Sequence, residues 1–423
     1  MKQPAFLLPR LGRRSFLLGS LGVTAAAAVG CSGSVDYTKV VTVGSDQSDD
    51  APRKAFAEMM AGFTAHETKV NTVDHETFKE GITNYLQGRP DDVFTWFAGY
   101  RARYFAEKEL VSDISDVWAN VEGMPESMKN ASSTTDGRQI FMPMTYYPWA
   151  VFYRPSLFAE RGYSEPKTFD EWMALNQQMA SDGLIPMAFA AKDGWEPMGT
   201  FDMLNLRING YDYHISLLAG NEAWDGDQVK KVFEVWAQML PYAQEAALGR
   251  TWQEAAQSLL QKQSGTFLLG MFLQQQFAAS EEAKDDLDFF IFPEIDPAIG
   301  ADVVEAPIDG FMMAADPRNL QGSRDLMLYL STPEAADIIV AADPSRIAAS
   351  SLADQSNYSA LQKKAVKVIE EAKNISQFLD RDSRPDFAST VIGPALQAFI
   401  RDPGNIDSIL DTVEKQKHFL FTS

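Results

Sequence analysis

The residues that follow position 38 alternate between short β-branched runs and amphipathic segments, and this order restricts the fold more than any other feature. Residues 39–44 hold four β-branched side chains in a row and end in a Gly-Ser-Asp loop, as buried strands do. Further strands are predicted at 69–73 and 92–97, with an amphipathic helix before each of them. Strand–helix–strand succession at this spacing forms a parallel sheet with right-handed crossovers. The sequence therefore predicts an α/β fold.

The chain is long enough for a second lobe. Its 423 residues exceed the usual ~100–200 residues of one domain. Thr168 and Glu171 have capping-box spacing at the start of an apolar helix stripe that includes Trp172. A second helical stripe runs through Val232 and Trp236. We expect both tryptophans in a core, and we expect two lobes, each a mostly parallel sheet flanked by helices.

Composition excludes several classes of protein. The net charge of −21 argues against nucleic acid as a partner, because the two surfaces would repel each other. A single cysteine, Cys31, rules out an intramolecular disulfide, a zinc knuckle and an iron–sulfur cluster. The four histidines are widely scattered, so a histidine-rich metal site is not expected. We predict no metal and no cofactor.

The first 30 residues have the pattern of an export signal. They carry four basic and no acidic side chains, and the apolar run from Phe16 to Val29 is too short to span a membrane comfortably. Arg13 and Arg14, followed by Phe16, resemble a bacterial twin-arginine signal. Residues 1–30 are therefore predicted to be a signal peptide.

Cys31 follows Ala28-Val29-Gly30, a pattern that resembles a lipobox, although the lipobox prefers leucine where Ala28 stands. The alternative is a plain secreted protein in which Cys31 has no role. Because the one cysteine directly follows a small residue at the end of the apolar run, we favour lipidation of Cys31, with residues 31–36 as a tether. This predicts an extracytoplasmic body anchored to the cell membrane.

Familiar catalytic motifs are absent from the sequence. It holds no P-loop, no Gly-x-Ser-x-Gly elbow and no His-Glu-x-x-His helix. Aromatic residues instead stand beside polar residues at loop-like positions, around Trp96, Trp149 and Trp195. An indole offers a flat face for the C–H face of a pyranose, and neighbouring polar groups can bond its hydroxyls. For Trp149 and Trp195, packing between the lobes is an equal alternative.

Several segments together resemble the extracellular solute-binding proteins of bacterial ABC importers, in the carbohydrate-binding, maltose-binding-protein-like branch (family 1). The resemblance covers essentially the whole mature chain. It rests on these segments: Val-Thr-Val-Gly-Ser at 41–45, 90–96, 143–147 with 151–154, 168–172, 201–212, 270–272 and 307–311.

The resemblance implies two lobes joined by hinge crossovers that close on a sugar between them. By analogy, lobe 1 spans 37–145 and 300–343, and lobe 2 spans 146–299 and 344–423. It implies a monomer that delivers a saccharide, an oligosaccharide or a glycoside, to an ABC permease. The residues that fall at cleft-facing segments, with Arg384 as a further candidate, are Asp46, Gln47, Trp96, Trp149, Trp195, Gln274, Asp309 and Arg384.

Two other functions remain open at the level of the sequence. A receptor for an anionic solute such as a glycerol phosphate ester would need an arginine or lysine cluster, or a helix N-terminus, in the cleft. A cell-surface glycosidase or lyase would need two carboxyl groups at a suitable separation with opposed pKa values. Neither arrangement can be read from spacing alone.

Overall fold

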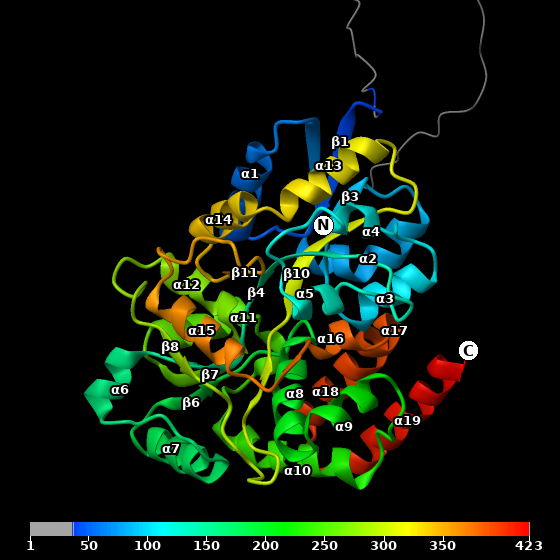
Figure 1. Ribbon diagram of the computed structural model, residues 1–423. Coiled ribbons are helices and arrows are strands. Elements are labelled where there is room, and N and C mark those ends of the chain that lie inside the picture. Colours follow the sequence, from blue (N-terminus) through cyan, green and yellow to red (C-terminus); the bar gives the residue numbers. More distant parts are fainter. Residues whose placement is uncertain (1–35, 37, 423) are drawn as a thin grey trace, which may run out of the picture. The chain divides into compact units, whose positions relative to one another are not determined.

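The computed structural model describes residue 36 and residues 38–422 (Figure 1). The predicted signal peptide, Cys31 and all of the predicted tether except Asp36 lie outside these residues. Among the described residues, no helix combines the length and the apolar character needed to cross a membrane.

The first sheet has six strands in the order β11-β4-β10-β3-β1-β2. Their bounds are β1 Val40–Ser45, β2 Glu67–Thr72, β3 Val93–Phe97, β4 Met142–Tyr146, β10 Ile308–Met313 and β11 Ile347–Ala348. The three strands expected near the N-terminus are confirmed, and β1 pairs in parallel with β2 and β3. The other pairings, β10 with β3 and β4, and β11 with β4, are antiparallel.

The second sheet has four strands in the order β6-β7-β5-β8. They are β5 Trp149–Tyr153, β6 Ile185–Ala188, β7 Ser264–Gly270 and β8 Asp288–Phe290. β5 is antiparallel to β7 and β8, and only β6 and β7 are parallel. The α/β class and the two lobes are confirmed, but the sheets are mixed rather than mostly parallel. In each sheet, a strand from later in the chain, β10 in the first sheet and β8 in the second, runs opposite to the earlier strands with which it pairs.

Helices cover both sheets (Figure 1). Around the first sheet they are α1 Asp50–Gly62, α2 His75–Gln87, α3 Tyr100–Glu107, α4 Ser115–Trp118, α5 Glu126–Ala131, α13 Leu320–Leu330 and α14 Pro333–Ala342. The middle of the chain supplies α6 Pro155–Arg161, α7 Phe169–Ser181, α8 Glu196–Ile208, α9 Tyr211–Leu218, α10 Asp227–Met239, α11 Trp252–Leu260 and α12 Gln274–Ala278. The C-terminal part adds α15 Ala360–Glu370, α16 Leu379–Asp382, α17 Pro385–Phe387, α18 Gly393–Arg401 and α19 Ile406–Thr422.

Local signals in the sequence explain several of these elements. Thr168 and Glu171 form the predicted capping box at the start of α7, which satisfies amide groups that the first turn leaves free. Trp172 and Trp236 are 0% and 1% exposed, so both predicted core positions are confirmed. The α10 helix ends at Met239, because Pro241 has no N–H to continue the α-helical hydrogen bonds, and Leu240–Tyr242 form a 3-10 turn instead.

The chain passes between the sheets at three places. The first passage is at Tyr147 and Pro148, between β4 and β5, and the expected boundary stands between residues 145 and 146. β9 Val303–Glu305 pairs with β12 Asn374–Ser376 as a small separate sheet, and the first sheet resumes only at Ile308, later than the expected boundary at 300.

The expected boundary at 343 also comes too early. β11 still pairs with β4, and Ala349 N donates to Met144 O. The Asp343-Pro344 break marks the end of α14, whereas a two-residue strand such as β11 has no pattern of its own to read.

Candidate functional site

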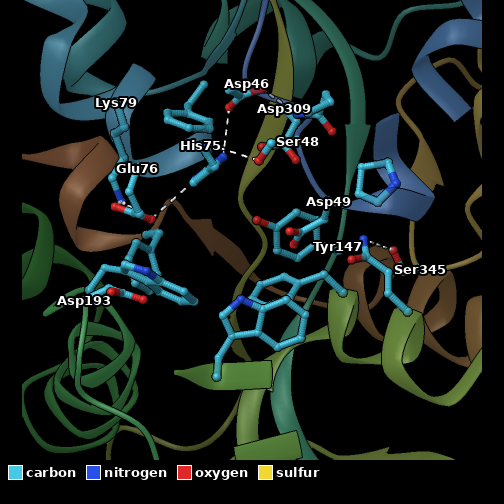
Figure 2. Close-up of a pocket in the computed structure, with 18 of the residues that line it drawn as sticks. Asp46, Ser48, Asp49, His75, Glu76, Lys79, Tyr147, Asp193, Asp309 and Ser345 are labelled. Atoms are coloured by element: carbon cyan, nitrogen blue, oxygen red, sulfur yellow. Dashed lines mark hydrogen bonds and ion pairs between the residues drawn. The ribbon is translucent and has the colours of Figure 1, made fainter. Parts of the chain in front are cut away.

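A pocket of about 380 Å³ lies between the two sheets (Figure 2). Loops at the carboxyl ends of β1, β2 and β3 contribute one wall. Tyr147, the start of α8, α11 and the residues after β7 contribute the opposite wall. Residues 378–381, at the start of α16, close a third side. The carboxyl ends of parallel strands are the usual position for a ligand in an open α/β sheet.

Asp46, directly after β1, is a buried carboxylate at this wall. It accepts hydrogen bonds from Thr95 Oγ1 at 2.8 Å and from Gln47 Nε2 at 2.6 Å, and its Oδ2 lies 3.1 Å from His75 Nδ1. Burial alone would raise the pKa of Asp46, but the hydrogen bonds, that of His75 first, hold it below its usual range. Although burial opposes it, the Asp46 carboxylate raises the pKa of His75. Asp46 is therefore a fixed anion that orients the His75 ring toward the pocket (Figure 2).

Two arginines and Asp309 form a second polar group. Arg381 Nη1 donates to Asp309 Oδ1 at 2.8 Å, and Arg381 Nη2 donates to Tyr147 Oη at 3.0 Å. Arg346 lies 3.5 Å from Asp309 and 2.9 Å from Asp343, and donates to Gln47 Oε1 at 2.6 Å. Both guanidinium groups are thus already paired with carboxylates of the protein.

Lys79 is the third cation of the pocket, and it is also paired. Its Nζ lies 3.1 Å from Glu76 and 3.3 Å from Asp380, and 5.8 Å from the centre of the Trp195 ring. Lys79 comes from α2 on one wall and Trp195 from the opposite wall. This cation–π contact therefore joins the two walls across the pocket.

The opposite wall is aromatic at its base, which forms the floor of the pocket. Trp149 is 3% exposed and stacks on Phe378, with ring centres 4.9 Å apart. Trp195 is more exposed and meets Trp149 and Phe272 edge-on. Trp252 also lines the pocket. A Cβ added to Gly199 of α8 would lie 2.1 Å from the Trp149 ring, so this glycine lets the ring approach the helix. Trp149 supports the floor, and Trp195 has the freer face.

Five of the eight residues predicted for the cleft line this pocket: Asp46, Gln47, Trp149, Trp195 and Asp309. Three predictions are wrong about position. Trp96 is 1% exposed and packs against Phe97 and Phe105 in the core. Side chains alternate along a strand, so Phe97, the next residue of β3, faces the pocket instead.

Gln274 and Arg384 also lie away from the pocket. Gln274 Nε2 donates to Lys284 O at 3.0 Å, whereas the next residue, Gln275, faces the pocket and donates to Asp343 and Ser345. Arg384 binds Asp386 and the Leu420 carbonyl, so its guanidinium is held on the side of α19.

Several lining residues were missed at the sequence level, and they are His75, Tyr147, Trp252, Phe272, Arg346 and Arg381. His75 carried a readable signal, since it begins the helix that follows the second parallel strand. Trp252 directly follows Thr251, which forms a capping box with Glu254. Arg346 and Arg381 had no such signal, because Arg346 stands in a short loop and Arg381 on a four-residue helix, both late in the chain.

The sequence pattern of the bacterial extracellular solute-binding protein family matches residues 47–337. The chain belongs to this family. Its membership confirms the predicted solute-binding class, extracellular and not enzymatic, and the two-lobed fold.

Similar solved structures agree with this membership. The bacterial solute receptor AcbH, described as having an exclusive preference for β-D-galactopyranose, is 40% identical with a TM-score of 0.88, and the match covers 91% of this chain and 100% of that one. A chitin oligosaccharide binding protein is 18% identical with a TM-score of 0.79, and the match covers 89% of this chain and 98% of that one. The second likeness shows the fold alone.

Curated relatives match over shorter stretches. An uncharacterized ABC transporter extracellular-binding protein of Pyrococcus horikoshii is 23% identical over 59% of this chain and 56% of its own length. A probable sugar-binding periplasmic protein of Mesorhizobium japonicum is 25% identical over 48% of this chain and 49% of its own length. The chain thus spans about half the length of the curated relatives it matches.

Proposed function

We propose that this solute-binding protein is the receptor of an ABC importer for a neutral saccharide, which it carries to a membrane permease. The observation that carries the proposal is the aromatic floor, in which Trp195 presents a ring face beside fixed hydrogen-bonding groups. Asp46, Asp309 and Gln47 supply acceptors, and His75, Lys79 and Arg346 supply donors, as sugar hydroxyls require.

The pocket favours a short sugar. Its volume of about 380 Å³ stands near the lower end of the ~300–1,000 Å³ usual for ligand pockets. This supports a mono- or disaccharide over the longer oligosaccharide that the sequence suggested. The preference described for AcbH makes D-galactose the first candidate.

An anionic solute is disfavoured by the charges of the lining. Seven carboxylate side chains and three lysine or arginine side chains line the pocket. The three cations are all paired with protein carboxylates. A phosphate ester would have to displace these partners and face the remaining acidic groups.

The experiment is isothermal titration of the mature chain with D-galactose, D-glucose, a galactose-containing disaccharide and glycerol 3-phosphate. We expect a neutral sugar to bind and to be recovered unchanged. Saturable binding of glycerol 3-phosphate alone, or conversion of the sugar, would overturn the proposal.

Membrane attachment through lipidated Cys31 is part of the same proposal, and it rests on the lipobox-like sequence. Replacement Cys31→Ser should release the protein to the soluble extracytoplasmic fraction with unchanged sugar affinity, since Cys31 precedes the folded body. Fractionation of cells that express either form tests this. A parent protein that is never membrane-attached would contradict the anchor.

A further inference from the structure

The four residues of α16, with Phe378 before them, lie between α3 of the first lobe and α8 of the second (Figure 1). Phe378, Asp380 and Arg381 line the pocket. On the side of the first sheet, Asp382 Oδ1 accepts from Tyr100 N at 3.0 Å. Gly99 packs so closely that an added Cβ would lie 2.7 Å from Arg381 O. A displacement of this short segment would therefore move three lining side chains together.

A single buried carboxyl holds the start of this segment. Asp202, on α8, is 0% exposed, and its Oδ2 accepts from Leu379 N at 2.8 Å. The carboxyl of Glu305, at the end of β9 and also 0% exposed, lies within hydrogen-bonding reach of the Asp202 carboxyl. Asp202 Oδ1 and both oxygens of Glu305 have no donor from any other group in the described part of the chain.

The cations nearest to the pair in the described chain make no direct contact with either carboxyl. In the described chain neither carboxyl forms an ion pair with lysine or arginine. His214 Nε2, on α9, is 3.8 Å from Asp202 Oδ1, but burial lowers the pKa of His214 to about 3, so the ring is neutral. Arg207, a buried cation on α8, donates to the Phe292 and Val303 carbonyls instead.

Charges on α16 also act on the pair. Asp380 and Asp382 oppose ionisation of Asp202, whereas Arg381 partly favours ionisation of Glu305. From β12, Ser376 is in register with Glu305, and its hydroxyl is buried without a hydrogen-bond partner among the described residues. Two adjacent carboxylates without a close cation cannot both be charged in a dry site at reasonable cost.

We propose that Asp202 and Glu305 share a proton, and that this proton fixes α16 so that the pocket binds its sugar, with affinity falling as the proton is lost above neutral pH. The two are positioning residues, because neither touches the pocket. Burial raises the pKa of both carboxyls well above the ordinary value, and the charge of Asp202 raises that of Glu305 further. Buried carboxyls of this kind can stay protonated beyond neutrality.

The affinity part rests on the proposed function, so the test has readouts with and without sugar. The dissociation constant for D-galactose is measured from neutral to alkaline pH in the parent, Glu305→Gln and Asp202→Asn. We expect the dissociation constant of the parent to rise at least about tenfold over this range. A tenfold rise means that the pKa of the carboxyl pair is one unit higher in the sugar-bound protein than in the free protein. The amide variants imitate the protonated pair, so they should bind at neutral pH and lose most of this rise.

Asp382→Asn is the matched control, because Asp382 is a buried carboxyl of α16 itself, whose pKa burial also raises. If Asp382→Asn abolishes the alkaline loss and Glu305→Gln keeps it, the inference is wrong. Galactose binding that is independent of pH in the parent would also overturn it.

Without sugar, infrared spectroscopy of the parent should show a protonated carboxyl at neutral pH that is absent from Glu305→Gln. If no sugar binds at any pH, the proposed function fails, while this absorption still decides whether the pair holds a proton. If the parent lacks the absorption of a protonated carboxyl, the inference is wrong. This measurement on the parent remains valid even if a variant does not fold.

Discussion

Trp195 and Trp236 are the same residue type in different surroundings, so they separate ligand contact from packing. Trp195 is partly exposed at the pocket floor, whereas Trp236 is 1% exposed and packs against Phe233 and Phe399. Trp195→Ala should weaken sugar binding by about 1–3 kcal/mol, five- to 150-fold in dissociation constant. Trp236→Ala should mainly lower the free energy of unfolding, by about 3–5 kcal/mol. Titrations and urea unfolding of both variants test the contrast, and unchanged affinity with lower stability for Trp195→Ala would contradict it.

The His75–Asp46 pair gives a prediction about pH. Its raised pKa means that folded His75 retains a proton which the unfolded chain releases near the ordinary pKa of about 6.5. The stabilisation is therefore complete below that value and is lost as pH rises through the raised pKa. Urea unfolding at a series of pH values should show this fall in the parent. The difference in unfolding free energy between the parent and His75→Gln isolates the pH-dependent stabilisation by the His75–Asp46 pair. Asp46→Asn should remove the same stabilisation. An identical pH dependence in parent and His75→Gln would disprove the coupling.

At the scale of elements, two helix glycines have opposite expectations. Gly199→Ala of α8 places a Cβ 2.1 Å from Trp149, so it should lower the free energy of unfolding by about 1–3 kcal/mol and disturb the floor. Gly81→Ala, in α2, meets nothing within 4 Å and should stabilise by up to about 1 kcal/mol, because alanine favours the helix. Thermal unfolding and galactose titration compare them. If the two variants change the free energy of unfolding equally, helix propensity, and not the contact with the Trp149 ring, determines the effect of Gly199→Ala.

Elements with a local hydrophobic or capping pattern were predictable from the sequence. Elements that form only by pairing with strands distant in the chain were not. β1, β2 and β3 and the capping box of α7 follow from local pattern. The antiparallel returns β10 and β11 depend on pairing with β4, which lies about 160 and about 200 residues earlier in the chain, respectively. The site follows the same division. The loop after β1 was found, Trp96 and Gln274 were each one residue from the side chain that faces the pocket, and Arg381 arrives on a four-residue helix without a sequence signal.

At the scale of the whole molecule, polar contacts join the two walls of the pocket directly. Gln275 Nε2, on α12, lies 3.2 Å from Asp343 Oδ2 and 3.2 Å from Ser345 Oγ, and Gln253 Nε2 lies 3.5 Å from Asp49 Oδ2. These contacts bring the second lobe against residues that pack with the first sheet. A movement of the two lobes apart would break these contacts.

We therefore expect solution scattering to give a smaller radius of gyration with saturating D-galactose than without it. Gln275→Ala should enlarge the sugar-free protein and weaken binding severalfold, because apparent affinity falls with the fraction of closed molecules. Gln276→Ala is the control, since Gln276 accepts from Gln257 on neighbouring α11 within the same lobe. If the sugar-free parent is already closed, its radius of gyration will not decrease when sugar is added, but that of Gln275→Ala still will. Scattering profiles that are the same with and without sugar in both proteins would rule out closure of the lobes on the ligand.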